Sequence, residues 1–337
     1  MARHAALIIA DEKQFPPAVF LASRLASLKA GRDIDVVLAT NHQPSFAQAK
    51  GFSSAFEVID ISDLQAGLSL PGAEHYTRAT FLSVFAPRIM QERYERLLYI
   101  DVDAYPNSEH VFDLFDLDMA GNAFAAVRDL NIPFIPNAGN VDELVDTLKI
   151  PSDNWLGSKY LNSGVLLIDL AGYRESRFEK KALAIVRDKK VPLRYADQTI
   201  FNTVLGGKWL ELSPAFNLVA NVWTTFVRDF SPPEIIHFAG GLKPWHRRFA
   251  YDHPMPRELA AFLKGTPWST FLADVNPPPT LAELTRTARA ANAPRRLEPW
   301  PNISRAAIVR LLAQTQFADV EQGLTQVNRG ALPVVNS

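Results

Sequence analysis

Two aspartates separated by one valine are the first residues of this chain whose spacing suggests chemistry. Asp101 and Asp103 directly follow the apolar segment Arg96–Ile100, which has the composition of a strand buried on both faces of a sheet. The carboxyl ends of such strands form the edge where open α/β sheets bind ligands. Two carboxylates at that edge suit a divalent cation, but a turn that caps the next element uses the same residues. Taken alone, the pair favours the turn.

A second group of polar residues follows the expected strand Glu234–Phe238. His237 lies near the end of this strand, Gly240 and Gly241 come next, and Lys243 follows. Glycines let backbone N–H groups approach an anion, lysine supplies a compact positive charge, and a neutral imidazole can join carboxylates on one cation. A structured loop with a hydrogen-bonded histidine explains the imidazole but leaves the run of glycine and lysine without a reason.

Two further pairs of polar residues border expected secondary structure. Asn162 and Ser163 precede an apolar strand, and Asp197 and Gln198 stand at the start of a helical pattern. In isolation the first pair favours a turn that enters a sheet. The second favours a helix N-terminus, where the dipole stabilises a carboxylate.

An α/β scaffold is needed to bring these residues together, and the chain has its pattern. Short apolar runs alternate with amphipathic segments over about the first 250 residues, which predicts a mostly parallel sheet with helices on both faces. A helix is expected from Pro16 to Lys29, because the first turn tolerates proline and Gly31 follows the end. The expected strands are Ala5–Ala10, Asp35–Ala39, Ala55–Ile59, Arg96–Ile100, Ala123–Arg128, Gly164–Ile168 and Glu234–Phe238.

Composition narrows the class of protein. The 337 residues, 47% hydrophobic and 21% charged, are those of a globular chain that can bury a sizeable core. A net charge of -1 gives no case for nucleic-acid binding. The lack of cysteine excludes disulfides, thiolate ligands and a cysteine nucleophile, and it fits a cytosolic chain. The apolar run Ala5–Ala10 is too short for a signal peptide, and no stretch approaches a membrane span.

Seven motifs, taken together and in order, resemble glycosyltransferase family 8, the group that contains the lipopolysaccharide galactosyl- and glucosyltransferases and glycogenin. The motifs are ADEKQF, HYTRATF, LLYIDVDAYP, AVRDL, YLNSGVLLIDL, ADQTIFN and HFAGGLKPW, and they span Ala10 to Trp245. The resemblance implies a GT-A fold, which is a Rossmann-like, mostly parallel sheet flanked by helices. It also implies transfer of a hexose, galactose or glucose, from a UDP-sugar to a saccharide or glycolipid acceptor, with retention of the anomeric configuration and a divalent metal, usually manganese.

Carried onto this sequence, the resemblance implies that Asp101, Asp103 and His237 bind the metal. Two carboxylates and an imidazole suit Mn²⁺ better than the nearly all-oxygen shell that Mg²⁺ prefers, and Mg²⁺ is the alternative. The chemistry also calls for a cation, because a departing diphosphate develops negative charge that a Lewis acid stabilises.

The resemblance places the UDP part of the donor against two parts of the chain. Ala10 and Asp11 match positions that read the uracil, and Phe15 stands about where the family stacks a tyrosine, although its spacing from Asp11 is one residue longer. The positions that match the remaining nucleotide and phosphate contacts are Val102, Gly240 and Lys243.

The sugar-binding positions supply charged and amide side chains, which hold hydroxyl groups best. The matching residues are Arg78, Asp129, Asn162, Asp197 and Gln198, with Ser163 beside them. Of these, Arg78, Asp197 and Gln198 are the candidate catalytic residues. Without the resemblance, Arg78 would be interpreted as a solvated helix arginine and Asp129 as a strand-end cap.

Gln198 decides the expected mechanism. Retention by double displacement requires a carboxylate nucleophile below the anomeric carbon. The position nearest that face carries Gln198, and an amide is a poor nucleophile. We therefore expect front-face displacement, in which the departing diphosphate helps to take the acceptor's proton and Gln198 steadies an oxocarbenium-like centre.

Two other functions share some of these features. A haloacid-dehalogenase-type phosphatase would use Asp101 as its nucleophile. That family expects the motif near the N-terminus with a Gly-Thr-like continuation, whereas here Ala104 and Tyr105 follow. A catalytically inactive sugar-nucleotide-binding protein is the other alternative, and a turnover assay would separate it from an enzyme.

The composition of the chain changes near Asn276. Three consecutive prolines follow this residue, and they cannot continue a helix or a central strand. We therefore expect a catalytic domain over residues 1–275 and a Pro/Arg-rich helical C-terminal extension over residues 276–337. Between Leu281 and Gln314 the sequence contains six arginines and two glutamates, among apolar residues.

This composition has two interpretations. The extension resembles an interfacial segment that rests weakly on an anionic membrane. The alternative, favoured because Pro294, Pro299 and Pro301 interrupt any long amphipathic helix, is a pair of short helices that pack on the catalytic domain or on another subunit. The expected location is cytoplasmic, with peripheral contact at the inner face of a membrane under the first interpretation.

Overall fold

The structure is a computed structural model that describes residues 2–29, 31–49, 52, 54–66, 81–129, 160–188, 193, 195–220, 233–241, 243–247, 249 and 252–276. The predictions for Arg78 and for the extension after Asn276 lie outside the described residues.

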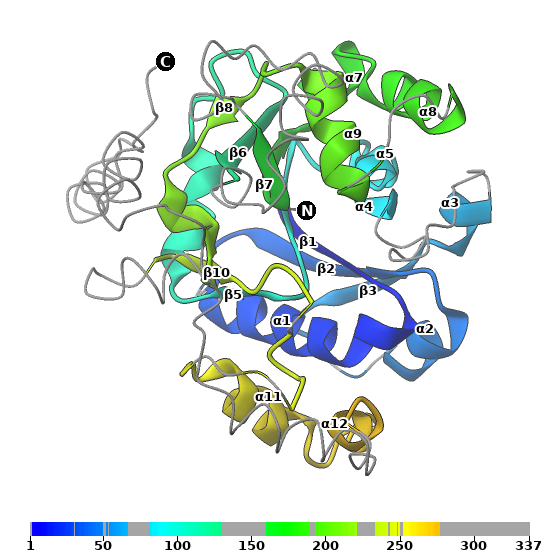
Figure 1. Cartoon of the computed structure of the whole chain (residues 1–337), viewed down its shortest axis with the longest axis vertical. Coiled ribbons are helices and arrows are strands. Elements are labelled where there is room, and N and C mark those ends of the chain that lie inside the picture. The colour runs from blue at the N-terminus through cyan, green and yellow to red at the C-terminus, as the bar shows by residue number, and fades with distance from the viewer. Residues whose placement is uncertain are drawn as a thin grey trace, which may run out of the picture.

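The main sheet has the strand order β3-β2-β1-β4-β7-β6-β8 (Figure 1). Its parallel pairs are β1 with β2, β1 with β4, β2 with β3, and β6 with β8, whereas β7 runs antiparallel between β4 and β6. The mostly parallel sheet that the sequence predicts is therefore confirmed. The strands are β1 (His4–Ala10), β2 (Ile34–Thr40), β3 (Glu57–Asp60), β4 (Arg96–Ile100), β6 (Phe124–Arg128), β7 (Leu161–Asp169) and β8 (Leu210–Glu211).

A second sheet of three short strands lies beside the main one, in the order β5-β10-β9. Its strands are β5 (Ala104–Pro106), β9 (Leu218–Val219) and β10 (Ile235–His237). The segment around His237 is thus a strand, as predicted, but it belongs to this small sheet. β5 begins directly after Asp103 and pairs antiparallel with β10, with Ala104 opposite His237. This pairing brings the histidine next to the aspartates from far along the chain.

Helices cover both faces of the main sheet. Figure 1 shows α1 and α2 on one side and α4, α5, α8 and α9 on the other. The long helix α1 begins with Phe15, Pro16 and Pro17 and ends at Leu28, close to the predicted bounds. The helices are η1 (Glu12–Gln14), α1 (Phe15–Leu28), α2 (Gln43–Ala49), α3 (Ser62–Ala66), α4 (Leu82–Phe85), α5 (Pro87–Met90), η3 (Glu109–Asp116), α7 (Leu170–Glu175), α8 (Phe178–Asp188), α9 (Ala196–Leu205), η7 (Pro214–Phe216), α11 (Met255–Leu263) and α12 (Phe271–Asp274).

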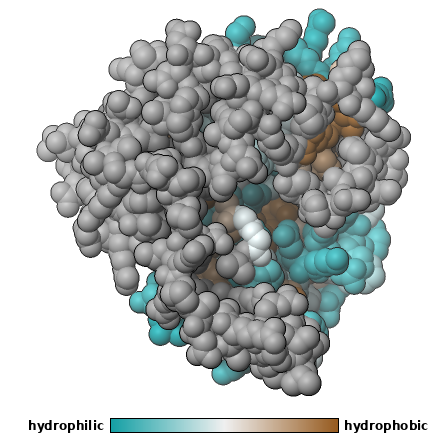
Figure 2. Space-filling model, in the orientation of Figure 1, coloured by the Kyte–Doolittle hydropathy of each residue, from teal (hydrophilic) through white to brown (hydrophobic). Residues whose placement is uncertain are grey.

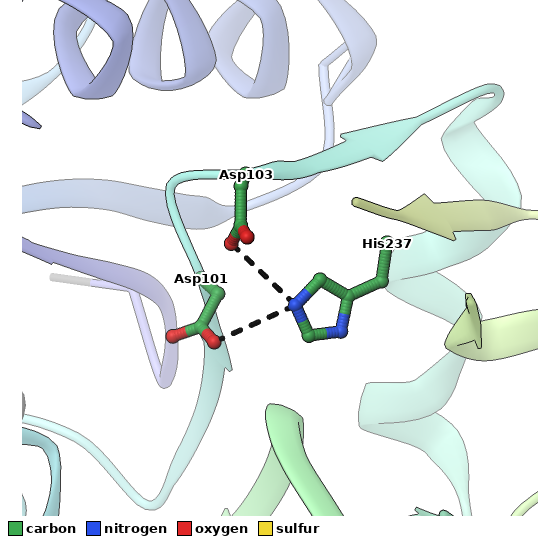
Figure 3. A group of neighbouring side chains, drawn as sticks. All are labelled: Asp101, Asp103 and His237. Carbon is green, nitrogen blue, oxygen red and sulfur yellow. Dashed lines mark ion pairs between the residues drawn. The ribbon is translucent and has the colours of Figure 1, made fainter. Parts of the chain in front are cut away.

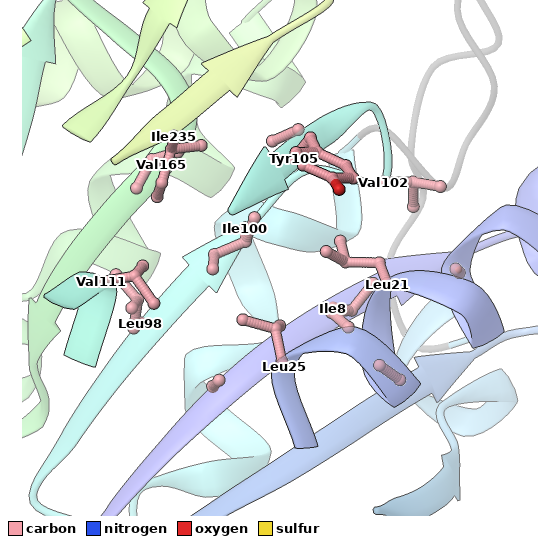
Figure 4. Packing of buried hydrophobic residues seen from close by; sticks show 14 of the residues in the cluster. Ile8, Leu21, Leu25, Leu98, Ile100, Val102, Tyr105, Val111, Val165 and Ile235 are labelled. Carbon is pink, nitrogen blue, oxygen red and sulfur yellow. The ribbon is translucent and has the colours of Figure 1, made fainter. Parts of the chain in front are cut away.

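Alternate residues of the strands fill two cores, one on each face. In β1, Ile8 joins the core that contains Leu21 and Leu25 of α1, and Leu7 joins the core under α4, α5 and α9. Figure 4 shows the first core close by, with Ile8 of β1 beside Leu21 of α1 and Leu98 of β4 beside Val111. Because successive strand residues point to opposite faces, strands that are apolar on both faces are the ones covered by two helix layers.

Helix α8 is apolar only on the face that it buries. In α8, Phe178 and Ala182 are buried while Lys180 and Lys181 are exposed. Hydrophilic atoms accordingly gather over α8 and around α2 in Figure 2. Within the described part of the chain, no helix is long and apolar enough to cross a membrane.

The strand ends that border the expected ligand site lie at one edge of the main sheet. β2 and β4 flank β1 on opposite sides, so the crevice outside their carboxyl ends is the expected ligand site of an open α/β sheet. Because β7 is antiparallel, its amino end lies at this same edge, beside the carboxyl ends of β4 and β6.

Candidate functional site

Two carboxylates and an imidazole meet at this edge. Nε2 of His237 lies 3.7 Å from Oδ2 of Asp101 and 3.5 Å from Oδ1 of Asp103. Figure 3 shows the imidazole reaching from β10 toward both aspartates, which stand on the turn after β4. One donor atom from each residue lies within 4.8 Å of the others, an arrangement that could hold a cation. The structure thus brings together the three residues that the sequence predicts as metal ligands.

The charges of this cluster are incompletely balanced. Burial and the neighbouring Asp103 carboxylate raise the pKa of Asp101. Burial also acts to raise the pKa of Asp103, but the ammonium of Lys243, paired with its Oδ2, and His237 hold that pKa below its usual range. Lys243 therefore compensates Asp103, whereas Asp101 is compensated by His237 only while the imidazole is protonated. A divalent cation would balance the remaining negative charge.

Gly164 leaves room for the imidazole. A Cβ atom on this residue of β7 would lie 2.2 Å from Cε1 and 2.6 Å from Nδ1 of His237. The ring therefore lies directly against the backbone of a central strand, and its Nε2 faces the carboxylates. Two carboxylates, an imidazole nitrogen and a recess that a side chain would fill fit a site for a divalent cation.

Gly164→Ala is expected to weaken the binding of Mn²⁺ by about 10- to 100-fold, the range seen when the support of a ligand is removed. Because β7 pairs with strands on both sides, the ring will move rather than the backbone. Isothermal titration of the metal measures the change. Gly241→Ala is the matched control, since its Cβ would meet nothing within 4 Å. Equal affinities in Gly164→Ala and the wild type would refute the role of the recess.

A buried set of amides and one carboxylate adjoins the cluster. Oδ2 of Asp129 accepts hydrogen bonds from Nδ2 of Asn162 at 3.2 Å and from Nε2 of Gln198 at 2.9 Å. Oε1 of Gln198 accepts from the backbone N–H of Ser163 at 3.3 Å. The register of β6 shifts between Ala126 and Arg128, and such bulges redirect side chains next to functional sites. The predicted sugar-binding residues that follow β6, lie in β7 and begin α9 are therefore close together.

Asp197, beside Gln198 at the start of α9, is buried without a nearby cation among the described residues. Oγ of Ser83 on α4 donates to its Oδ2 at 2.9 Å. Burial and the Asp101 carboxylate raise the pKa of Asp197 to about 7. The carboxyl group therefore holds a proton over a pH range in which an exposed aspartate has lost it.

This shifted pKa predicts a pH-dependent stability. The unfolded chain loses the proton near the ordinary value of 3.8 and the folded chain near 7, so stability falls as pH rises between these values. The slope is at most about 1.4 kcal/mol per pH unit. Asp197→Asn should remove this contribution in urea denaturation with EDTA at pH 5 and pH 7, whereas Asp118→Asn, at an exposed position, should keep it. Identical pH slopes for Asp197→Asn and the wild type would argue against the buried proton.

The residues predicted to contact the nucleotide are only partly brought together. Ala10 ends β1, and the side chain of Asp11 accepts from the backbone N–H of Gln14 at 3.1 Å, so it caps η1. Val102 is buried between the aspartates, and Gly240 is exposed with a φ of +99°, a conformation that favours glycine.

Phe15 is not brought to the site. Its ring is fully buried in the core and packs edge-to-face against Trp268 at 5.8 Å. No face of the ring remains for a base to stack on, so the structure corrects the prediction that Phe15 takes the place of the family's tyrosine.

Two buried residues of the site were missed by sequence reasoning. Asn217 contacts His237, and Ser83 contacts Asp197. Neither lies in a recognisable motif. Both contacts join elements distant in the chain, and only the fold reveals them.

Comparison with known proteins identifies relatives over most of this chain. The family described as Glycosyl transferase family 8 matches residues 22–248. A lipopolysaccharide 1,2-glucosyltransferase of Escherichia coli (strain K12) is 28% identical over 209 residues, which are 59% of this chain and 58% of that protein. A lipopolysaccharide 1,3-galactosyltransferase of Salmonella typhimurium (strain LT2) is 25% identical over 230 residues, 66% of this chain and 65% of that protein. The matches thus span less than two thirds of either relative's length.

Solved structures share the fold at lower sequence identity. The galactosyltransferase LgtC in complex with donor and acceptor sugar analogs has a TM-score of 0.61 at 22% identity, covering 79% of this chain and 99% of that chain. The bifunctional glycosyltransferase WbbM has a TM-score of 0.64 at 18% identity, covering 82% of this chain and 52% of that chain. These similarities support the predicted GT-A fold.

Proposed function

Because the chain belongs to glycosyl transferase family 8, we propose that it moves a hexose, galactose or glucose, from a UDP-sugar to a saccharide or glycolipid acceptor. The observation that carries the proposal is the convergence of Asp101, Asp103 and His237 beside a buried set of amides at the ligand-binding edge of the sheet. The names of the lipopolysaccharide glucosyl- and galactosyltransferases among the relatives support a hexose donor.

Asp101, Asp103 and His237 would hold Mn²⁺, which when bound supplies a Lewis acid for the departing diphosphate. Lys243 adds a second positive charge at this site, since its ammonium lies against Asp103. The left-handed backbone at Gly240 suits a loop that offers N–H groups to phosphate oxygens. These residues of the chain bind and orient the leaving group.

The amide set is suited to hold the hexose. Asp129, Asn162 and Gln198 are each less than 10% exposed, and each is fixed by hydrogen bonds before any sugar binds. Preorganised side chains of this kind lose little entropy on binding a hydroxyl group. The buried Asp197 next to them can donate as well as accept a hydrogen bond while it is protonated.

We propose front-face displacement as the chemical step. The bond between the anomeric carbon and the phosphate oxygen breaks, the acceptor oxygen bonds to the same face of the carbon, and the acceptor's proton passes to the departing phosphate. Gln198 steadies the positive charge that develops on the sugar. Its amide is held by Asp129 and by the backbone of Ser163, and it offers no carboxylate nucleophile.

Release of nucleoside diphosphate from a panel of UDP- and GDP-sugars, with a candidate saccharide acceptor present, tests this function. We expect release of UDP from UDP-galactose or UDP-glucose with Mn²⁺, less with Mg²⁺, and none in EDTA. Full activity in EDTA would contradict the metal assignment. Binding of a UDP-hexose without any turnover would instead favour an inactive sugar-nucleotide-binding protein, and the family assignment does not favour a phosphatase that uses Asp101.

We also propose that the chain is cytoplasmic and that residues 276–337 pack on the catalytic domain or on another subunit, with weak contact at the inner face of a membrane as the alternative. Each basic residue near an anionic surface contributes only about 1 kcal/mol, so binding should be sensitive to salt. If the extension instead contacts a membrane, sedimentation with anionic vesicles at low salt will carry down the full-length chain and spare a chain truncated at residue 275. Equal sedimentation of both chains, or of neither, would leave oligomerisation or packing on the catalytic domain as the role of the extension.

A further inference from the structure

Asn217 is a buried residue, only 2% exposed, that contacts the candidate metal ligand directly. Its Oδ1 lies 3.0 Å from Nδ1 of His237, and its Nδ2 donates to Oδ1 of Asn162 at 2.9 Å. It follows η7 and precedes β9, whose parallel pairing with β10 places Val219 alongside His237. The backbone therefore holds Asn217 between the cation cluster and the amide set.

Two groups with fixed roles set the direction of this chain of hydrogen bonds. The backbone N–H of Gly164 can only donate, and it donates to Oδ1 of Asn162 at 2.9 Å. The carboxylate of Asp129 accepts from Nδ2 of the same amide. Asn162 thus turns its oxygen toward Asn217, which must present its NH₂ group to Asn162 and its oxygen to His237.

The orientation of Asn217 determines the tautomer of the imidazole. Because the oxygen of Asn217 accepts a hydrogen bond, Nδ1 of neutral His237 carries the proton. Nε2, which faces Asp101 and Asp103, then keeps its lone pair. A cation requires that lone pair, and a hydrogen bond at the other ring nitrogen is how metal-binding histidines are oriented.

We propose that Asn217 is a positioning residue that fixes the cation-binding tautomer of His237 and ties it to the sugar-binding amide of Asn162. It couples the two halves of the donor site, the half that holds the diphosphate and the half that holds the hexose. Only the sugar half of this inference rests on the proposed function.

Asn217→Leu, which keeps nearly the same shape, removes both hydrogen bonds. We expect the affinity for Mn²⁺, measured by isothermal titration, to fall by about 10- to 100-fold. We also expect the tautomer preference of His237 to be lost in the metal-free protein. Long-range ¹H–¹⁵N spectra, recorded at a pH at which the nitrogen shifts of His237 themselves show a neutral imidazole, report the tautomer. A His237→Ala variant assigns the signals among the seven histidines.

Asn217→Asp separates the two roles and guards against a Leu variant that does not fold. A carboxylate still accepts from Nδ1 of His237, so the tautomer and the Mn²⁺ affinity should be kept. It cannot donate to Asn162, so the amide set loses its alignment. We expect the affinity for UDP-galactose and UDP-glucose to fall by about tenfold or more, while the affinity for UDP is unchanged.

Three results would overturn the proposal. They are a proton on Nε2 of His237 in the wild type, unchanged Mn²⁺ affinity in a folded Asn217→Leu variant, and equal loss of UDP and UDP-hexose affinity in Asn217→Asp. The tautomer is measured without metal or donor. If the wild type releases UDP from no donor, the proposed function fails, and the spectra still decide on Asn217.

Discussion

Asp103→Asn is expected to lower transfer by about 10³-fold or more, because it removes one cation ligand and with it several kcal/mol of charge stabilisation on the leaving group. The change keeps the shape of the side chain and deletes only its negative charge. Asp103 is also the partner of Lys243, so the variant leaves that ammonium unpaired. Weaker binding of both Mn²⁺ and UDP should accompany the loss of turnover, since the cation and Lys243 would both face the diphosphate.

The fold should survive this substitution. Asp103 stands on the turn between β4 and β5, and losing one of two neighbouring carboxylates relieves repulsion while it removes the pair with Lys243. The two effects oppose each other, so we expect the free energy of unfolding in EDTA to change by less than about 2 kcal/mol. Asp118→Asn makes the same chemical change at an exposed site and should keep full activity. A folded Asp103→Asn enzyme with wild-type turnover in Mn²⁺ would remove Asp103 from the ligand set.

The ligand pair was predictable in part because it depends on a local pattern. An apolar run followed by Asp101 and Asp103 identifies a strand and its functional end within a few residues. His237 required the family resemblance, because its proximity to Asp103 depends on the pairing of β5 with β10, two strands of three residues each. β5, β8 and β9 are too short to show a periodicity, so they were not expected from the sequence.

The prediction for Phe15 was wrong because it followed the family resemblance and not the packing of α1. Phe15, Ala18, Val19, Ala22 and Leu25 are all fully buried on one face of α1. This spacing of three and four residues is that of a buried helical stripe, and the sequence already contained it. Aligning Phe15 by its distance from Asp11 overlooked the rotation of the helix. A residue in phase with the core cannot also offer its ring at the edge of the sheet.

Asn217 could not be predicted by either route. A lone asparagine after a proline-containing turn is ordinary in sequence, and its importance arises only when β9 pairs with β10. Buried polar chains of this kind combine side chains from several elements. Here they come from β7, α9 and β10 and from the residues directly after β6 and η7, and each must be in place before any hydrogen bond in the chain can be assigned.

Gln198→Ala is expected to lower the turnover number by about 10²- to 10³-fold, the loss typical of removing one preorganised group that stabilises developing charge. The Michaelis constant for the UDP-hexose should change much less, because Asp129 and Asn162 remain to hold the sugar. The truncation also leaves the backbone N–H of Ser163 and one site on Asp129 unfilled, and water can occupy both. Gln91→Ala, at a half-buried position on the end of α5, is the matched control and should keep wild-type kinetics.

The same variant discriminates between the two routes to retention. In front-face displacement no sugar is ever bonded to the protein, so mass spectra of Gln198→Ala with a slow donor should show only the unmodified chain. Double displacement would require a carboxylate to attack, and Asp197 and Asp129 are the nearest candidates in the described site. Both are poorly suited, since Asp129 already accepts two hydrogen bonds and Asp197 is buried with a pKa of about 7. A glycosylated peptide containing either aspartate would overturn the front-face route and would make that residue the nucleophile.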